Sequence, residues 1–168
     1  MVINKAETCC FTGHRAVKLA WRDDESDPRC EELKNKIYNA AEAVYLSGKH
    51  RFICGMANGC DMYFGESVIN LRFKYPGISL EAAVPWEGQA DKWPLDLKER
   101  YMRLISGCDC LTVVSKAYTP DCMYRRNRYM VDSSAALIAV YNGLAGGTRQ
   151  TMLYALRKGL DVIEIRID

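Results

Sequence analysis

Long hydrophobic runs are missing from this chain. None of its apolar segments approaches the roughly 20 residues that a membrane-spanning helix needs. The N-terminal residues also lack the apolar core of a signal peptide, and repeats and low-complexity tracts are absent. We therefore expect a cytoplasmic protein without a membrane partner.

Histidine is scarce, and neither sign of charge dominates. The chain has two histidines, His14 and His50, and no C-x-x-C pair, so a zinc site has little support and we expect no metal. Lysine and arginine number 23 against 21 aspartate and glutamate residues, a net charge of +2. This balance excludes a generally basic surface, so any contact with nucleic acid would have to come from a local patch.

Cysteine is frequent, with eight residues, but the expected compartment argues against disulfides. Cys9, Cys10, Cys54 and Cys110 lie in or beside apolar strand-like runs, where a free cysteine usually behaves as a small core residue. Cys60 stands at the expected start of a helix. Its thiol either has a lowered pKa there or is an inert small side chain, and we favour the second interpretation.

Apolar runs and helical periodicities alternate along the chain. Strands are expected at residues 8–12, 52–54, 79–84, 111–115, 136–141 and 162–167. Helices are expected from the Asp27-Pro28 cap to Gly48 and at residues 62–75, 95–106, 124–132 and 147–158. This α/β pattern predicts a Rossmann-like three-layer sandwich, with a mostly parallel sheet of about six strands and helices on both faces. The length suits a single domain, 1–168.

The most informative stretch is G-M-A-N-G-C-D at 55–61, between an expected strand and an expected helix. In parallel sheets ligands bind beyond the carboxyl ends of the strands, where this stretch lies. Gly55 and Gly59 would let the backbone turn tightly and come close to a phosphate at the helix N-terminus. Asp61 would cap the helix or bind sugar hydroxyls. The stretch is neither G-x-G-x-x-G nor G-x-x-x-x-G-K-[ST], so no standard dinucleotide or NTPase site follows.

A second segment, T-G-H-R, follows the first expected strand. Thr12 offers a hydroxyl, Gly13 allows close approach of a ligand to the backbone, and Arg15 offers a fork for phosphate. His14 is a candidate acid or base, but no nucleophile or orienting partner is evident. We therefore favour an ordinary packing role for this histidine.

A third segment, Y-R-R-N-R at 124–128, is the sharpest positive patch in the chain. Arg126, Asn127 and Arg128 stand near the start of an expected helix, where arginines oppose the helix dipole. Anion binding is therefore favoured over a solvated face with an ion pair between Arg128 and Asp132, which are spaced i, i+4.

Two further segments lie on the same expected rim. Trp86 and Trp93 flank a polar loop, where the indoles either stack on a base or, as we favour, anchor the loop to the core. Gly146 and Gly147 repeat the glycine turn before the last helix, with Thr148 as a cap or a phosphate donor.

The order of these motifs resembles the SLOG superfamily, which joins the DNA-processing protein DprA, the LOG phosphoribohydrolases and the YpsA-like proteins. The resemblance rests on T-G-H-R at 12–15, G-x-A-x-G-x-D at 55–61, R-N-R at 126–128 and G-G-T at 146–148. The length, the loop between the tryptophans and M-V-D-S at 130–133 look most like the small, single-domain YpsA/YoqJ-like branch. The resemblance covers nearly the whole chain.

The resemblance and the residues together imply a binding domain for a nucleotide or a nucleotide-derived ligand such as ADP-ribose or NAD. The candidate ligand-binding residues are Thr12, Gly13, Arg15, Gly55, Gly59, Asp61, Arg126, Asn127, Arg128, Asp132, Gly146, Gly147 and Thr148. No other cofactor is expected, and a homo-oligomer is left open.

Two other functions stay open at this point. One is binding of single-stranded nucleic acid, resembling DprA, through the arginines at 125–128. The other is N-glycosidic hydrolysis, resembling the LOG enzymes. In that case Asp61 or Asp132 would have to replace the catalytic glutamate, because Thr151 occupies the corresponding position.

Overall fold

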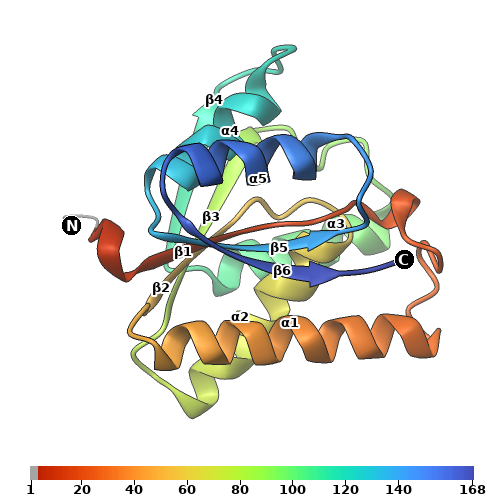
Figure 1. Ribbon diagram of the computed structural model, residues 1–168. Helices are drawn as coiled ribbons and strands as arrows, with labels where there is room; N and C mark the ends of the chain where they lie inside the picture. The colour runs from red at the N-terminus through yellow and green to blue at the C-terminus, as the bar shows by residue number, and fades with distance from the viewer. Residues whose placement is uncertain (1–3) are drawn as a thin grey trace.

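The computed structural model of this protein describes residues 4–168, whose strands form one parallel sheet (Figure 1). The strands are β1 Thr8–Thr12, β2 Arg51–Cys54, β3 Ser79–Trp86, β4 Cys110–Ser115, β5 Ala136–Tyr141 and β6 Asp161–Arg166. Their order across the sheet is β4-β3-β2-β1-β5-β6, and every neighbouring pair is parallel. The predicted six-stranded parallel sheet is confirmed.

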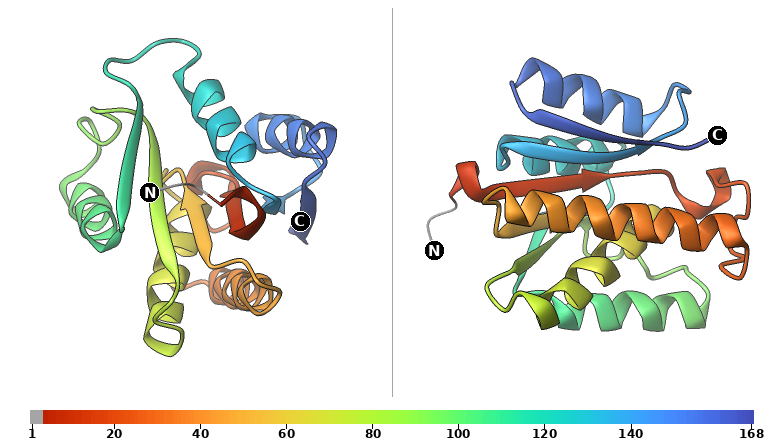
Figure 2. Two further views of the ribbon diagram at one scale, coloured as in Figure 1. Left: turned by 90° about the vertical axis from the view of Figure 1, so that its left-hand side faces the viewer. Right: turned by 60° about the horizontal axis from the view of Figure 1, so that its bottom comes forward.

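Helices cover both faces of the sheet, as the views in Figures 1 and 2 show. The helices are α1 Pro28–Leu46, α2 Cys60–Lys74, α3 Leu95–Gly107, α4 Cys122–Asp132 and α5 Gly147–Arg157. Short 3-10 turns, η1 Lys5–Glu7 and η2 Ala16–Lys18, were not predicted. α1, α2 and α3 pack on one face, and α4 and α5 on the other. The Rossmann-like sandwich is therefore confirmed, with each predicted element within two residues of its observed bounds.

The sheet separates two hydrophobic layers. Phe11 of β1 stacks on Phe64 of α2 with ring centroids 4.4 Å apart, in the larger layer beneath α1 and α2. Cys10, the preceding residue of β1, faces the other layer with Met130 of α4 and Met152 of α5. Successive side chains of a strand point to opposite faces, so a strand covered on both sides is apolar at every position.

The edge of the sheet departs from the prediction in two places. β3 continues through Pro85 to Trp86, and it pairs there with β4 alone, because its register with β2 ends at Ala82. The missing amide of Pro85 is tolerated where one side of the strand has no partner. Cys110 begins the edge strand β4 and is exposed, so the predicted core role is wrong for this cysteine.

The order of the strands reverses next to β1. The chain adds β2, β3 and β4 on one side of β1, then returns to place β5 on its other side. The loops that follow β1 and β5 therefore leave the sheet in opposite directions, toward α1 and α5 (Figure 1). A crevice at such a reversal is the usual ligand site of open α/β sheets. Within residues 4–168 no helix is long and apolar enough to cross a bilayer.

Candidate functional site

A cavity of about 150 Å³ lies at this reversal, and we call it the switch-point cavity. Its walls come from the loop after β1, the start of α2, the first turns of α4 and the start of α5. Eight predicted ligand-binding residues line it: Thr12, Gly13, Arg15, Asp61, Arg126, Asn127, Gly147 and Thr148. The motifs that are far apart in the sequence are thus brought to one place.

The start of α5 contributes Gly147 and Thr148 to the wall of the cavity. Gly146 is the N-cap and gives the helix no side-chain cap. A β-carbon on Gly147 would meet no atom of the described chain, other than its own helix, within 4 Å. The first turn of α5 therefore has no side-chain cap and borders the cavity, where the positive end of a helix attracts an anion.

Cationic side chains come from the loop after β1. Arg15 is exposed, and its Nη2 contacts Sδ of Met123 at 3.2 Å. Lys18 also lines the cavity, and its Nζ lies 3.2 Å from the position that a β-carbon on Gly146 would occupy. Sequence reasoning missed Lys18, because it belongs to no motif and reaches α5 only through the turn η2.

Asp61 is buried and supports the loop before its own helix. Its Oδ2 accepts a hydrogen bond from the Ala57 amide at 3.1 Å, whereas the N-cap of α2 is Gly59. Burial raises the pKa of the Asp61 carboxyl, and the charge of Arg126 opposes this rise. The carboxylate thus stabilises the loop before α2 and does not cap the helix. Asp61 also lines the cavity, so its binding of a sugar hydroxyl stays a prediction.

Arg126 is buried, although it lines the cavity. Its Nη1 donates to the carbonyl of Gly55 at 2.9 Å and to that of Ala83 at 3.3 Å, and its Nε donates to Oδ1 of Asn127. Burial lowers the pKa of the guanidinium. A β-carbon on Gly55 would lie 2.2 Å from Nη1, so Gly55 is needed to make room for Arg126 rather than for a phosphate.

Gly59 joins two loops of the protein. Its φ is +107°, and a β-carbon there would lie 2.5 Å from the backbone nitrogen of Ala16. The Ala16 amide donates to the Asn58 carbonyl, and the Cys60 amide donates to the His14 carbonyl. Sequence analysis assigned Gly59 to a phosphate, but the space beside its α-carbon is occupied by the loop after β1.

His14 connects the loops on either side of the reversal. Its Nε2 accepts a hydrogen bond from the Asn142 amide, after β5, at 3.1 Å. Burial, and then the charge of Lys18, lower the pKa of His14. A neutral imidazole that accepts a backbone hydrogen bond agrees with the favoured packing role.

Cys60 does not have an activated thiol. The residue is buried, and burial raises its pKa, with the charge of Asp61 adding to the rise. The dipole of α2 does not offset this desolvation, so the interpretation of Cys60 as an inert small residue is confirmed.

Arg128 and Asp132 lie outside the switch-point cavity. Asp132 ends α4, near the amino end of β5 and so away from the carboxyl ends of the strands, and accepts a hydrogen bond from the Tyr154 hydroxyl at 2.7 Å. Arg128 lies between the rings of Tyr124 and Tyr154, with its guanidinium carbon 4.4 and 4.6 Å from their centroids. Asp61 is thus the single carboxylate in the described lining of the cavity.

The Arg128 stack lines a large groove between α4 and α5. We call it the α4–α5 groove, about 550 Å³ in volume, lined mostly by apolar atoms and adjoining the switch-point cavity at Asn127. Its walls also carry Arg157 and the exposed Leu153. The tertiary structure thus places Arg126 and Arg128, which are two positions apart in the sequence, in different cavities.

The tryptophans at the two ends of the loop between β3 and α3 have different neighbours. Trp86 meets the Tyr118 ring edge-on with centroids 6.0 Å apart, and Trp93 meets Tyr101 in the same way at 5.4 Å. Trp93 packs against the larger hydrophobic layer, which is the role that the sequence favoured. Trp86 ends β3 and its partner Tyr118 is exposed, so the predicted contact with the core does not hold for Trp86. Trp93 also lines a further cavity next to Arg15.

Comparisons with known proteins agree with this architecture. The family model YpsA, described as YspA SLOG family, matches residues 9–163. The chain is 32% identical to the uncharacterized SPbeta prophage-derived protein YoqJ of Bacillus subtilis (strain 168), with 77% of this chain and 83% of that protein covered. It is 23% identical to a UPF0398 protein of Bacillus thuringiensis (strain Al Hakam), with 88% and 80% covered.

A solved structure shares the fold. The X-ray structure of DNA processing protein A (DprA) from Streptococcus pneumoniae superposes with a TM-score of 0.68 at 15% identity. The match covers 98% of this chain but only 52% of that one, so the chain spans about half of DprA. The matched family model, the relatives and the six-stranded fold lead to one conclusion: this chain belongs to the YpsA-like branch of the SLOG superfamily.

Proposed function

We propose that the switch-point cavity binds a nucleotide or a nucleotide-derived ligand through its phosphate, in a cytoplasmic protein. The observation that carries this proposal is the uncapped start of α5, with open space beside Gly147, next to the cations Arg15 and Lys18. Backbone amides at a helix N-terminus and flexible cations together suit a phosphate group. The cytoplasmic assignment is supported by eight free cysteines.

The charges divide the cavity into two parts. Arg15, Lys18 and the amides of α5 form a positive side, while Asp61 contributes the carboxylate. A phosphate is repelled by Asp61 but attracted by the α5 side, whereas ribose hydroxyls donate readily to a carboxylate. We therefore orient the ligand with its phosphate at Gly147 and its ribose toward Asp61.

Calorimetric titration with AMP, ADP-ribose, NAD and ribose 5-phosphate tests the proposal. At least one of these ligands is expected to bind with a Kd below about 1 mM. Failure of all four to bind at that level contradicts the proposed function.

A substitution at Gly147 separates the ligand site from the scaffold. Gly147→Leu places a side chain in open space at the first turn of α5, so the melting temperature should stay near that of the wild type. The same side chain fills the space proposed for the phosphate, so ligand binding should be lost. Gly77→Leu is the matched control, because Gly77 also lies in open space but far from the cavity. Unchanged binding by Gly147→Leu would place the phosphate elsewhere.

The α4–α5 groove supports a second candidate function, the binding of single-stranded nucleic acid. Tyrosines on either side of Arg128, together with Arg157, offer stacking surfaces and positive charge. One solved structure with this fold is that of a DNA processing protein, although its likeness to this chain concerns the fold alone. The overall charge of +2 gives this candidate less support than the phosphate site receives.

Fluorescence anisotropy with a labelled oligonucleotide distinguishes the two candidates. Nucleic-acid binding in the groove should weaken steeply with salt and fall in Arg157→Gln. Arg103→Gln, on the exposed surface of α3 across the sheet, is the control and should leave that binding unchanged. No oligonucleotide binding at low salt would leave the nucleotide site as the single supported function.

A further inference from the structure

A second cavity of about 310 Å³ adjoins the switch-point cavity, and we call it the side cavity. The two cavities share Arg15, Ala57 and Met123 in their walls. The side chains of Arg15 and Met123, in contact at 3.2 Å, lie in the wall common to both. Because Arg15 is exposed, a rotation of its side chain away from Met123 would join the two cavities and let one ligand occupy both.

The walls of the side cavity suit a planar ring better than a second phosphate. Trp93, Leu97 and Val17 contribute apolar surface, while Asn58 and Gln89 contribute amides. Its one cation is the shared Arg15, and Asp23 adds a negative charge. Apolar surface with a few hydrogen-bonding groups is typical of a site for an organic ring.

Gln89 supplies an acceptor that lacks a donor. The residue is 8% exposed, and its Nε2 donates to the Gly55 carbonyl at 3.3 Å. A carbonyl only accepts, so this bond fixes which end of the amide faces Gly55. The Oε1 atom is buried and has no hydrogen-bond partner within residues 4–168. An unpaired buried acceptor is unfavourable, and a ligand N–H group would relieve it.

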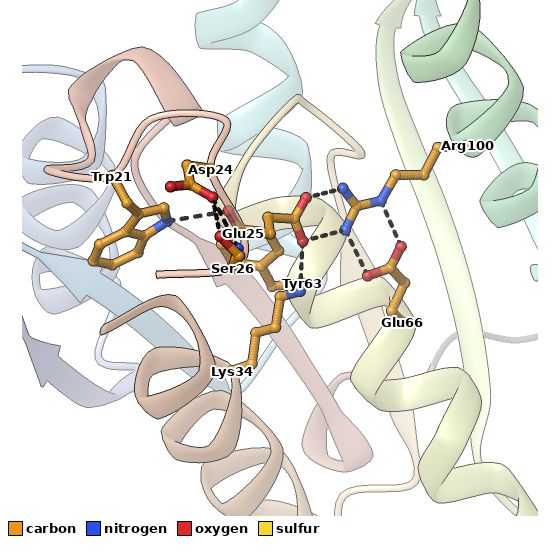
Figure 3. Close-up of polar contacts among 8 residues, drawn as sticks. All are labelled: Trp21, Asp24, Glu25, Ser26, Lys34, Tyr63, Glu66 and Arg100. Carbon is orange, nitrogen blue, oxygen red and sulfur yellow. Dashed lines mark hydrogen bonds and ion pairs between the residues drawn. The ribbon is translucent and has the colours of Figure 1, made fainter. Parts of the chain in front are cut away.

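One wall of the side cavity is held in place by the ion-pair cluster in Figure 3. Glu25 accepts hydrogen bonds from Lys34 of α1 and from Arg100 of α3. Arg100 also donates to Glu66 of α2, with its Nε 2.6 Å from Oε1. The loop that carries Asp23 is thereby tied to helices α1, α2 and α3. The side cavity is therefore formed before a ligand arrives.

We propose that the side cavity is the base subsite of the ligand, and that it selects a base with an exocyclic amino group. This inference rests on the proposed function, which supplies the phosphate at α5. The amino group donates to Oε1 of Gln89, and the ring lies against Trp93 and Leu97. Because Oε1 is covered in the free protein, a small rotation of the Gln89 amide accompanies binding.

Matched nucleotides that differ at the amino group test this selection. AMP should bind at least about tenfold more tightly than IMP, and CMP more tightly than UMP, because IMP and UMP present a carbonyl oxygen to Oε1. Ribose 5-phosphate should bind more weakly than AMP, since it leaves the side cavity empty. Equal affinities of ribose 5-phosphate, AMP and IMP would overturn the base subsite and leave the phosphate site standing. Absence of binding by all of them would overturn the proposed function itself.

Two variants check the subsite from independent directions. Gln89→Leu should remove the preference for AMP over IMP while ribose 5-phosphate binding is retained, which also reports that the fold is intact. Val17→Trp fills the side cavity from an exposed position, so it should weaken AMP but not ribose 5-phosphate. Lys92→Leu, an exposed change in the loop of Trp93 that does not line the cavity, is the control and should alter neither ligand. Retention of the AMP preference in Gln89→Leu would overturn the proposal.

The Tyr101 hydroxyl provides the last check. It lies beside the Gln89 amide: burial raises the pKa of Tyr101, and the nearby Gln89 amide opposes this rise. If the ligand is the donor to Oε1, Tyr101→Phe should keep the preference for AMP over IMP. Loss of this preference in Tyr101→Phe with Gln89 intact would show that the tyrosine, not Gln89, selects the base.

Discussion

At the residue scale, glycines in similar sequence motifs are needed for different physical reasons. Gly55 leaves room for Arg126, Gly59 lets two loops pack together, and Gly147 lies beside open space. The neighbour of the missing side chain differs in each case: a side chain at Gly55, a backbone at Gly59 and the space proposed for the ligand at Gly147. A glycine motif therefore predicts close packing without predicting what packs there.

Gly59 and Gly48 form a matched pair that separates backbone strain from crowding. Their φ values are +107° and +108°, but a β-carbon would be crowded only at Gly59. Gly48→Ala should lower the free energy of unfolding by about 1–2 kcal/mol, the strain of a left-handed residue. Gly59→Ala should lower it by about 1–3 kcal/mol more, because the methyl group meets the Ala16 backbone. Chemical denaturation measures both, and equal losses would contradict the loop contact.

His14 should make the stability depend on pH. Its folded pKa lies below the ordinary value of 6.5, so between these two values the unfolded chain binds the additional proton. The contribution of neutral His14 to the free energy of unfolding is therefore fully present above about pH 6.5. It is lost as the pH falls through the pKa of the folded state. Denaturation midpoints across this range should decline for the wild type and decline less for His14→Gln. Parallel pH profiles for the two proteins would rule out this role.

At the element scale, one arginine adds a cation–π contact between α4 and α5 to their apolar packing. Arg128 extends from α4 between Tyr124 of the same helix and Tyr154 of α5. This cation–π stack explains why a positive residue is favourable in a helix whose first turns already carry Arg125 and Arg126. Arg125 and Arg126, two and three positions before Arg128, face different surroundings, because a helix turns about 100° per residue.

Arg128→Ala should lower the free energy of unfolding by about 1–2 kcal/mol, since two ring contacts are lost. Arg125→Ala is the control, because Arg125 is exposed and its single contact, with the Val114 carbonyl, is long at 3.5 Å. Its effect should stay within about 0.5 kcal/mol. Urea denaturation measures both variants, and equal effects would mean that the stack adds nothing to the packing of α4 on α5.

At the scale of the whole molecule, one sheet supports both hydrophobic layers. β1 contributes Phe11 to the layer under α2 and Cys10 to the layer under α4, so neither layer survives loss of this strand. We therefore expect one cooperative unfolding transition, as the predicted single domain requires. Far-ultraviolet circular dichroism and tryptophan fluorescence should give coincident urea curves. Separate midpoints would indicate two units that unfold independently.

The sequence by itself determined the α/β class, the order of the elements and the rim on which the motifs lie. These features follow from local patterns: apolar strands, helical periodicity, and glycine or proline at the ends of elements. Eight of the candidate residues do line the switch-point cavity, because parallel strands bring their carboxyl ends to one edge.

Only the tertiary structure decided which neighbours each residue has. Arg126 donates to backbone carbonyls, Asp132 lies outside the cavity, and Lys18 lines it. Burial also raises the pKa of Cys60, whereas its place at the start of a helix had suggested a lowered pKa as one alternative. These outcomes depend on desolvation and on contacts between distant segments. The spacing of residues along the chain predicts neither of them.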